Sequence, residues 1–168
     1  MQSESFLKNT EQRTNPHKSV DAILIRQIEF ADAEAAAQLS AELGYPAVAE
    51  EMKERISVVN SLRDRVVYVA CIANKAIGWI DVSIVHHLST GSHGEIGGLV
   101  ISAAYRGGGI GGKLITQAEQ WVAGQGISRM VVRSRITREA AHRFYLREGY
   151  TIEKTSLVFS KQLKPRTS

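Results

Sequence analysis

The segment Arg106-Gly107-Gly108-Gly109-Ile110-Gly111-Gly112 is the part of the chain best suited to bind an anion. It follows an apolar stretch typical of a strand and precedes apolar residues at helical spacing, so it stands where a helix begins. The first amides of a helix have no partner within it, and the helix dipole favours negative charge there. Glycines let successive amides point at one anion without interference from Cβ. The segment therefore indicates a phosphate-binding loop, although a tight turn alone would need similar glycines.

Two known phosphate loops share part of this pattern. Gly107, Gly109 and Gly112 satisfy the G-x-G-x-x-G fingerprint of dinucleotide-binding proteins, but a spacer, 103–106, separates the strand from the glycines. That fingerprint needs an immediate turn. The P-loop pattern G-x-x-x-x-G-K also matches, but it continues with a Ser or Thr that holds magnesium, and Leu114 cannot do so. Both matches are incomplete. The hypothesis of a nicotinamide-dependent oxidoreductase is supported by the G-x-G-x-x-G fingerprint alone.

Two further residues are candidates for moving protons. Glu95 stands at the start of an apolar strand, and a carboxylate with a raised pKa takes a proton from an amine directly or through water. Tyr145 shares a helical face with Ala141 and Phe144, and a phenol can give a proton. From the residues alone, Tyr145 is better explained as a core aromatic, and Glu95 equally well as a solvated side chain at a strand end.

The remaining candidates are histidines, one aspartate and the single cysteine. His86, His87 and His93 match no common zinc spacing, so we expect solvated loop histidines and no metal. Asp81 lies on a mostly apolar strand, where it faces either a cleft, in which it could bind a cation, or solvent. Cys71 lies in an apolar run and is expected in the core. A lone cysteine cannot form an internal disulfide, which agrees with a reducing compartment.

The elements that must position these residues follow from the apolar spacing. Residues 89–94 are expected to form the loop between the third and fourth strands. Thr137 is the expected cap of the last helix. Residues 150–163 should hold one last strand or a pair. The order of strands and helices predicts an α/β fold with a mixed sheet. Strands joined by short hairpin-like turns come first, and strands joined through crossover helices follow. Strands are predicted over 23–28, 66–73, 76–87, 95–102 and 129–135, and helices over 31–43, 47–61, 110–124 and 137–148.

Length and composition indicate one ordinary globular domain. The chain has 168 residues, of which 43% are apolar and 23% charged, enough for a single core. Residues 1–20 are polar and lack the apolar region of a secretory signal, so we expect a flexible leader followed by one domain over 21–168. No apolar run is long enough to cross a membrane, and a cytoplasmic location is expected. The net charge of +4 suits an anionic ligand, but the spread of basic residues does not indicate nucleic-acid binding.

The glycine-rich segment resembles the signature Arg/Gln-x-x-Gly-x-Gly/Ala of the GNAT acetyltransferase superfamily. The stretch Glu95-Ile96-Gly97-Gly98-Leu99-Val100-Ile101 resembles the family's fourth strand, and 138–145 followed by 149–150 resembles its last helix. Residues 43–46 and 158–163 are similar to a bacterial subgroup that acts on small substrates. The resemblance covers roughly 23–163. It implies a GNAT-type fold, which is a mixed, mostly antiparallel central sheet with helices on both faces and splayed middle strands.

This resemblance implies an N-acetyltransferase that moves the acetyl group of acetyl-CoA to a primary amine by direct attack in a ternary complex, without a metal. The alternative is a non-catalytic acyl-CoA-binding or regulatory domain that has kept the fold. Pantetheine is expected to bond the backbone of the fourth strand, where two glycines, Gly97 and Gly98, suit a bulge. The expected cofactor-binding residues are Leu99, Val100, Ile101, Arg106, Gly107, Gly108, Gly109, Ile110, Gly111, Gly112 and Lys113.

The resemblance also implies catalytic roles. Tyr145 falls where many members carry the tyrosine that protonates the leaving thiolate, and Glu95, eleven residues before Arg106, matches the general base of the histone-acetyltransferase branch. Arg138 and Arg135 stand where relatives often have asparagine, and they either reach cofactor phosphate or face water. The acceptor is expected to be a small-molecule amine or a protein amino group, with no nucleic-acid or membrane partner, and homodimers are frequent in the family. Candidate acceptor-lining residues are Tyr45, Glu50 and Glu51.

Overall fold

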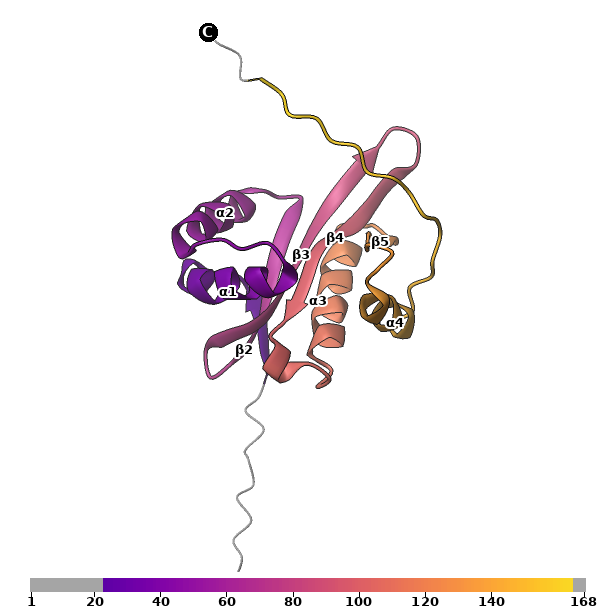
Figure 1. Ribbon diagram of the computed structural model, residues 1–168. Coiled ribbons are helices and arrows are strands. Elements are labelled where there is room, and N and C mark those ends of the chain that lie inside the picture. The colour runs from indigo at the N-terminus through magenta and orange to yellow at the C-terminus, as the bar shows by residue number, and fades with distance from the viewer. Residues whose placement is uncertain (1–22, 165–168) are drawn as a thin grey trace, which may run out of the picture.

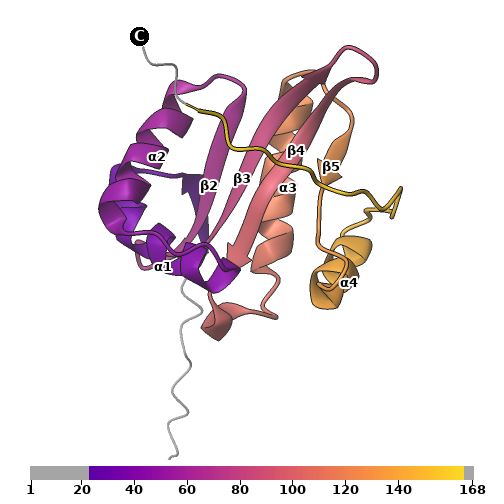
Figure 2. The same cartoon turned by 45° about the horizontal axis from the view of Figure 1, so that its top comes forward.

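The protein folds around one five-stranded sheet, as a computed structural model of residues 23–164 shows (Figure 1; Figure 2). The predicted leader, 1–20, lies outside the described residues. Within 23–164, no helix is long and apolar enough to cross a membrane. In chain order the elements are β1 (Leu24–Gln27), the short 3-10 turn η1 (Phe30–Asp32), α1 (Ala33–Leu43), α2 (Ala49–Ser61), β2 (Arg65–Ile72), β3 (Lys75–His87), β4 (Gly91–Ile101), η2 (Ala103–Tyr105), α3 (Ile110–Gly124), β5 (Met130–Val132) and α4 (Glu139–Arg147).

The strands lie side by side in the order in which they occur along the chain, β1-β2-β3-β4-β5. The first four pair with antiparallel neighbours, whereas β5 pairs with β4 in parallel. A parallel neighbour needs a crossover, which α3 supplies. The predicted mixed, mostly antiparallel sheet is therefore confirmed.

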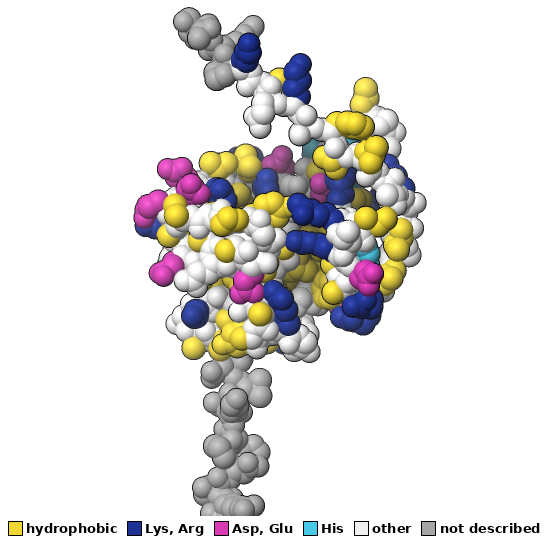
Figure 3. All heavy atoms as spheres, in the orientation of Figure 1, with side chains coloured by type: hydrophobic (Ala, Val, Ile, Leu, Met, Phe, Trp, Pro, Cys, Tyr) yellow, Lys and Arg dark blue, Asp and Glu magenta, His cyan; other side chains and the backbone are white. Residues whose placement is uncertain are grey.

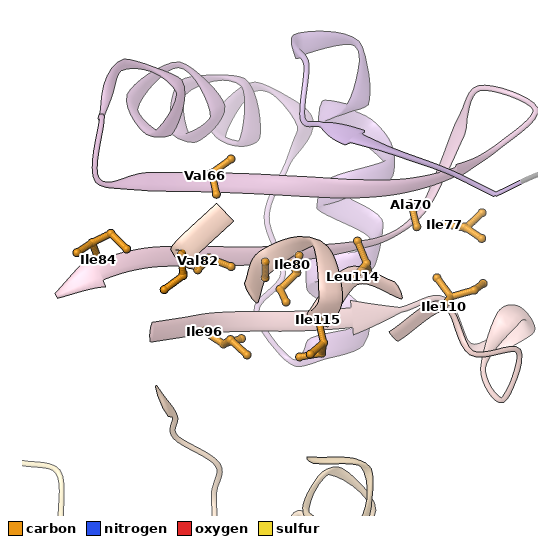
Figure 4. Packing of buried hydrophobic residues seen from close by; sticks show 12 residues of the cluster. Val66, Ala70, Ile77, Ile80, Val82, Ile84, Ile96, Ile110, Leu114 and Ile115 are labelled. Atoms are coloured by element: carbon orange, nitrogen blue, oxygen red, sulfur yellow. The ribbon is translucent and has the colours of Figure 1, made fainter. Parts of the chain in front are cut away.

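Helices cover both faces of the sheet, and each face has its own core. On one face, α1 and α2 pack against β2 and β3 around Val69 and Cys71, so the expected core position of the cysteine is confirmed. On the other face, α3 packs Leu114 and Ile115 against the inward residues of β3 and β4 (Figure 4). Burial of these apolar side chains on two faces is the main force holding the sheet. The residues drawn and labelled there are Val66, Ala70, Ile77, Ile80, Val82, Ile84, Ile96, Ile110, Leu114 and Ile115.

A buried ion pair fixes the start of α1. Asp32 is 4% exposed, and its carboxylate accepts hydrogen bonds from the two Nη atoms of Arg26 at 2.7 and 2.8 Å and from the Glu29 amide at 2.9 Å. Burial alone raises the pKa of Asp32, but these hydrogen bonds outweigh it and hold the pKa below its ordinary value. The carboxylate is therefore charged at neutral pH and ties β1 to the α1 layer.

The β3–β4 hairpin is longer than predicted. The expected loop over 89–94 is wrong, because β4 begins at Gly91 and pairs with His87 at the hairpin end. The β4 residues that extend the ladder, 91–94, include no apolar side chain, and the Nδ1 atom of His86 lies 2.7 Å from the Ser92 hydroxyl oxygen. Backbone ladder bonds form whatever the side chains are, so this part of the strand carries no apolar alternation by which to recognise it.

The C-terminal elements also differ from the predictions. The last helix begins at Glu139 with Arg138 in the cap position, so Thr137 is not the cap, and β5 is shorter than 129–135. No strand forms in the described part of 150–163, which the pattern assigned to a last strand or a pair. An apolar pattern gives only strand propensity, and a ladder also needs a partner edge. Large apolar side chains stay exposed here, namely Ile152, Leu157, Val158, Phe159 and Leu163.

Candidate active site

A cleft opens where β4 and β5 separate. The two strands pair only at Gly94, Glu95 and Ile96 of β4. Beyond Ile96, β4 pairs with β3 alone, so the edge of β4 from Gly97 to Ile101 faces the gap without a neighbouring strand in the described part of the chain. An unpaired edge offers backbone N–H and C=O groups to an extended ligand, which adds to the sheet like another strand.

Two glycines shape this edge. Asp81 of β3 pairs with Gly98 and Val82 pairs with Ile96, so Gly97 is the extra residue of a β-bulge. A Cβ on Gly98 would lie 2.8 Å from the Trp79 ring, and a Cβ on Gly97 would lie 3.2 Å from an oxygen of Asp81. The predicted bulge is confirmed, and a side chain at either position would press on a side chain of β3.

Four segments line the cleft. They are the open part of β4, the end of β5 with the loop after it, the end of α1 with the loop after it, and α4. In Figure 3, Lys and Arg side chains gather near the centre of the face, between the α1–α2 layer and α4. The lining residues are Leu43, Tyr45, Ile96, Gly97, Gly98, Leu99, Val132, Arg133, Ser134, Arg135, Arg138, Ala141 and Tyr145.

Tyr145 lines the cleft and also packs against the α3-side core. Its ring meets those of Phe144 and Tyr150 edge-on, with centroids 5.2 and 5.6 Å apart. Burial raises the pKa of Tyr145 to about 12, and the positive charge of Arg138 acts in the opposite direction. The hydroxyl is therefore protonated throughout the neutral range and can donate a hydrogen bond to an anion in the cleft.

Glu95 lies where β4 and β5 still pair, at the closed end of the gap. Its carboxylate forms an ion pair with Arg133, which lines the cleft, and lies 3.4 Å from Nε2 of His93. Glu95 itself is not among the lining residues, so it adjoins the cleft through its arginine partner. His93 is 4% exposed and stacks on His87 at 5.4 Å, so the expectation of a solvated loop histidine is wrong for His93.

Asp81 is held by an arginine from the neighbouring strand. Its Oδ1 atom accepts a hydrogen bond of 2.8 Å from Nε of Arg65, and Nη2 of the same guanidinium pairs with Oδ2. Neither residue lines the cleft. Within 23–164, no group of three or more His, Cys, Asp and Glu side chains could hold a metal ion.

The glycine-rich loop turns directly into α3. Gly107 and Gly109 have φ angles of 83° and 76°, a left-handed conformation that favours glycine, and Gly109 is the N-cap of α3. The first helical bond runs from the Lys113 amide to the Gly109 carbonyl at 3.2 Å. The amides of residues 110–112 therefore have no acceptor within the helix and no capping side chain. This arrangement suits a phosphate group.

The next two glycines make room for α4. A Cβ on Gly111 would lie 3.0 Å from the Phe144 ring, and a Cβ on Gly112 would lie 3.0 Å from a carboxylate oxygen of Glu148. Because few Cβ atoms come so close to a neighbour, a larger residue at either position would require the Phe144 ring or the Glu148 side chain to shift. The sequence pattern did not reveal this second requirement.

Arg106 ties the loop to two neighbouring elements. Its Nε donates to the Ile101 carbonyl at 2.9 Å, and its Nη2 lies 3.0 Å from Oε2 of Glu42 on α1. The same carboxylate oxygen accepts the Ala103 amide at 3.0 Å. Arg106 thus holds the loop against the end of β4, and Glu42, which the sequence did not single out, is its anchor.

Arg135 and Arg138 reach across the mouth of the cleft towards the end of α1. Nη2 of Arg138 donates to the Leu43 carbonyl at 2.9 Å, and Nη2 of Arg135 lies 3.5 Å from the Tyr45 hydroxyl. Tyr45 lines the cleft as expected for an acceptor-lining residue, whereas Glu50 and Glu51 lie exposed on α2, where each pairs with a basic neighbour on that helix.

Comparison with known proteins places this geometry among acetyltransferases. A model of the acetyltransferase (GNAT) family matches residues 30–150. An aminoalkylphosphonate N-acetyltransferase from Salmonella typhimurium is 35% identical over 106 residues, which cover 62% of this chain and 68% of the relative.

Solved structures share the fold at low sequence identity. AAC(6')-Iy, in complex with a bisubstrate analogue containing CoA, matches with a TM-score of 0.75 and 17% identity, over 84% of this chain and 99% of that chain. A transcriptional regulator from Bacillus halodurans C-125 matches with a TM-score of 0.74 and 20% identity, over 83% of this chain and 100% of that chain. At such identity these matches show the fold alone.

Proposed function

The chain belongs to the GNAT family and is an acyltransferase that uses acetyl-CoA, and we propose that it passes the acetyl group directly to the primary amine of a small molecule bound beside the donor. The relative from Salmonella typhimurium is named for aminoalkylphosphonates, and the AAC(6')-Iy complex holds an aminoglycoside-derived analogue. Both acceptors are small amines. The observation that carries the proposal is the open edge of β4 beside Tyr145, with an anion-binding loop at the end of the same strand.

The described residues fit the shape and charge of acetyl-CoA, which supplies the acetyl group as an activated thioester. The backbone groups of Leu99 and Ile101 face the gap at the free edge of β4 and suit the amide groups of a pantetheine arm, whereas Val100 between them pairs with β3. The Ile101 carbonyl already accepts a bond from Arg106, so the pantetheine would share this oxygen or bond elsewhere along the edge. The free amides at the start of α3 would hold the pyrophosphate, with Lys113 exposed beside them.

Tyr145 would stabilise the departing sulfur. Its hydroxyl is protonated, because burial raises its pKa to about 12, and it makes no hydrogen bond to another described residue that would compete. A donor held in a partly buried cleft stabilises the negative charge that develops as the thioester breaks. Tyr145 would therefore donate a hydrogen bond to the sulfur as the thiolate leaves.

Glu95 would help the amine to lose its proton. An ammonium group cannot attack, so the acceptor must be deprotonated before or during the transfer. Glu95 is paired with Arg133, which lines the cleft, so a water in the cleft would connect the carboxylate to the amine. The ion pair with Arg133 would hold the Glu95 carboxylate in position beside the cleft.

Direct transfer is favoured over an acetylated enzyme by the position of the single cysteine. Cys71 is 1% exposed within the α1–α2 core, and burial raises its pKa, so its thiolate is disfavoured. A nucleophilic cysteine needs exposure and a lowered pKa. In the described residues, this thiol is not available to carry the acetyl group.

The proposal is tested by following CoA release from acetyl-CoA with a panel of small primary amines and identifying the N-acetyl product by mass. Intersecting initial-velocity lines are expected when both substrates are varied, because both must bind before transfer. Parallel lines, with an acetyl group found on the protein by mass spectrometry, would overturn direct attack. Failure of every amine to increase CoA release would overturn the proposed reaction.

A further inference from the structure

Two arginines at the cleft mouth, Arg135 and Arg138, take no part in the transfer described above. Both are exposed, and both line the cleft. Their polar contacts across the mouth are the Leu43 carbonyl and the Tyr45 hydroxyl, which are neutral. Neither positive charge is therefore neutralised by the group that it touches.

The other charges near the cleft are already paired. Arg133 is paired with Glu95, and Arg65 is paired with Asp81. No Asp or Glu is present among the described residues that line the cleft. Arg135 and Arg138 therefore leave the cleft mouth positive, and a concave site with charge of one sign concentrates ligands of the opposite sign.

These arginines are far from the loop suited to pyrophosphate. The loop packs on the C-terminal half of α4, since Gly111 faces Phe144 and Gly112 faces Glu148. Arg138 stands at the opposite end of that helix, in the cap position. Six to ten residues of helix separate these points, which is about 9 to 15 Å. The positive charge at the mouth is thus available to an anion other than the pyrophosphate.

We propose that Arg135 and Arg138 bind an anionic group of the acceptor, so that the preferred substrate is a short primary amine carrying an oxyanion such as a phosphonate or a carboxylate. This inference rests on the proposed function, because it assigns the acceptor of that reaction. Guanidinium groups match such oxygens with planar, paired donors. Arg138 lies seven residues before Tyr145, two helical turns, so both side chains face the cleft from the same side of α4.

The first experiment compares amines of similar length and different charge at saturating acetyl-CoA. The probes are 2-aminoethylphosphonate, β-alanine, ethanolamine and 1,4-diaminobutane. We expect kcat/KM for at least one of the two anionic amines to exceed that for ethanolamine by about 30-fold or more, with 1,4-diaminobutane lowest, since two charge-assisted hydrogen bonds are gained. Preference for the phosphonate or for the carboxylate then identifies the oxyanion. Equal values for anionic and neutral amines, or a preference for the dication, would overturn the inference.

The second experiment removes each charge in turn. Arg135→Gln and Arg138→Gln should each lower the ratio of kcat/KM between the better anionic amine and ethanolamine by about tenfold, mainly through KM, and Arg138→Lys should retain part of the ratio. The matched control is Arg143→Gln, because Arg143 is an exposed arginine of the same helix that does not line the cleft. An unchanged ratio with a raised KM for acetyl-CoA would assign the arginines to the cofactor and overturn the inference.

A binding measurement separates failure of the proposed anion site from failure of the proposed acetyl transfer. Calorimetry of 2-aminoethylphosphonate and β-alanine with the CoA-loaded protein reports the anion site without turnover, and the affinity of the better ligand should fall about tenfold in either glutamine variant. If all amines are acetylated equally well, the proposed function stands and the inference fails. If no amine is acetylated, the proposed function fails, and absence of binding by both ligands overturns the inference as well.

Discussion

Replacing Tyr145 by phenylalanine removes a single hydroxyl from the cleft and leaves the ring. The ring makes the contacts with Phe144, Tyr150 and the α3-side core, so these contacts persist in the variant. The hydroxyl makes no hydrogen bond to another described residue, so its loss leaves no partner unsatisfied. We therefore expect the free energy of unfolding to change by no more than about 0.5 kcal/mol.

The effect on catalysis follows from the acidity of the hydroxyl. The pKa of Tyr145 is about 12, whereas a thiol titrates near 8.5, so full proton transfer to the free thiolate is uphill. The hydroxyl then acts mainly as a hydrogen-bond donor to the developing charge, and such a bond is worth about 1.5 to 3 kcal/mol. Since about 1.4 kcal/mol of activation free energy corresponds to a tenfold change in rate, kcat should fall roughly 10- to 150-fold.

The assay is steady-state CoA release with an acceptor that the wild-type protein acetylates, together with calorimetry of acetyl-CoA binding. The affinity for acetyl-CoA should stay within twofold, and the pH profile below pH 10 should keep its shape, because Tyr145 does not titrate there. Tyr68→Phe is the matched control, since Tyr68 packs against the same core but does not line the cleft. A kcat for Tyr145→Phe equal to that of this control would refute the reasoning.

Three further changes test other parts of the molecule. Glu95→Gln should lower kcat while leaving the affinity for acetyl-CoA nearly unchanged, whereas an unchanged kcat would remove Glu95 as the base. Gly98→Ala should cost about 1 to 3 kcal/mol by chemical denaturation, because its Cβ would press on the Trp79 ring, while Gly108→Ala, with its nearest atom at 3.7 Å, should cost far less. Asp32→Asn should lower the free energy of unfolding by about 2 kcal/mol at pH 7. Because the pKa of Asp32 is lowered in the folded state, the wild-type protein should be the more stable one above about pH 4. This difference should vanish as the pH falls through the folded pKa. An advantage that does not decline as the pH is lowered from about 4 would contradict this origin.

The sequence predicts the parts of the site that depend on local chemistry. Two consecutive glycines inside an apolar strand indicated the bulge at Gly97, and glycines between a strand and a helix indicated free amides at the start of α3. Both features are dictated by the backbone over a few residues, so they leave a local signature. The role proposed for Tyr145 needed the family resemblance, because its spacing alone fits a core aromatic equally well.

The contacts that close the cleft join residues far apart in the chain, and no local pattern encodes them. Arg138 and Leu43 are 95 positions apart, and Arg106 and Glu42 are 64 apart. Nothing in the periodicity around an exposed arginine tells which carbonyl it reaches. The positive charge of the cleft mouth therefore depends on the end of α1 and the start of α4 lying side by side, which no local pattern predicts.

The C-terminal end of α4 packs closely over two glycines of α3, Gly111 and Gly112. In the described structure α4 has no fully buried residue, and it is held partly by Phe144 and Tyr145, which pack against the α3-side core. The Phe144 ring also lies over Gly111, and at the other end of the helix Arg138 donates to the Leu43 carbonyl. Because Tyr145 lies next to Phe144, we expect a side chain at position 111 to shift the Phe144 ring and with it the proposed hydrogen-bond donor. On this proposal, Gly111 serves the position of Tyr145 as well as the binding of an anion.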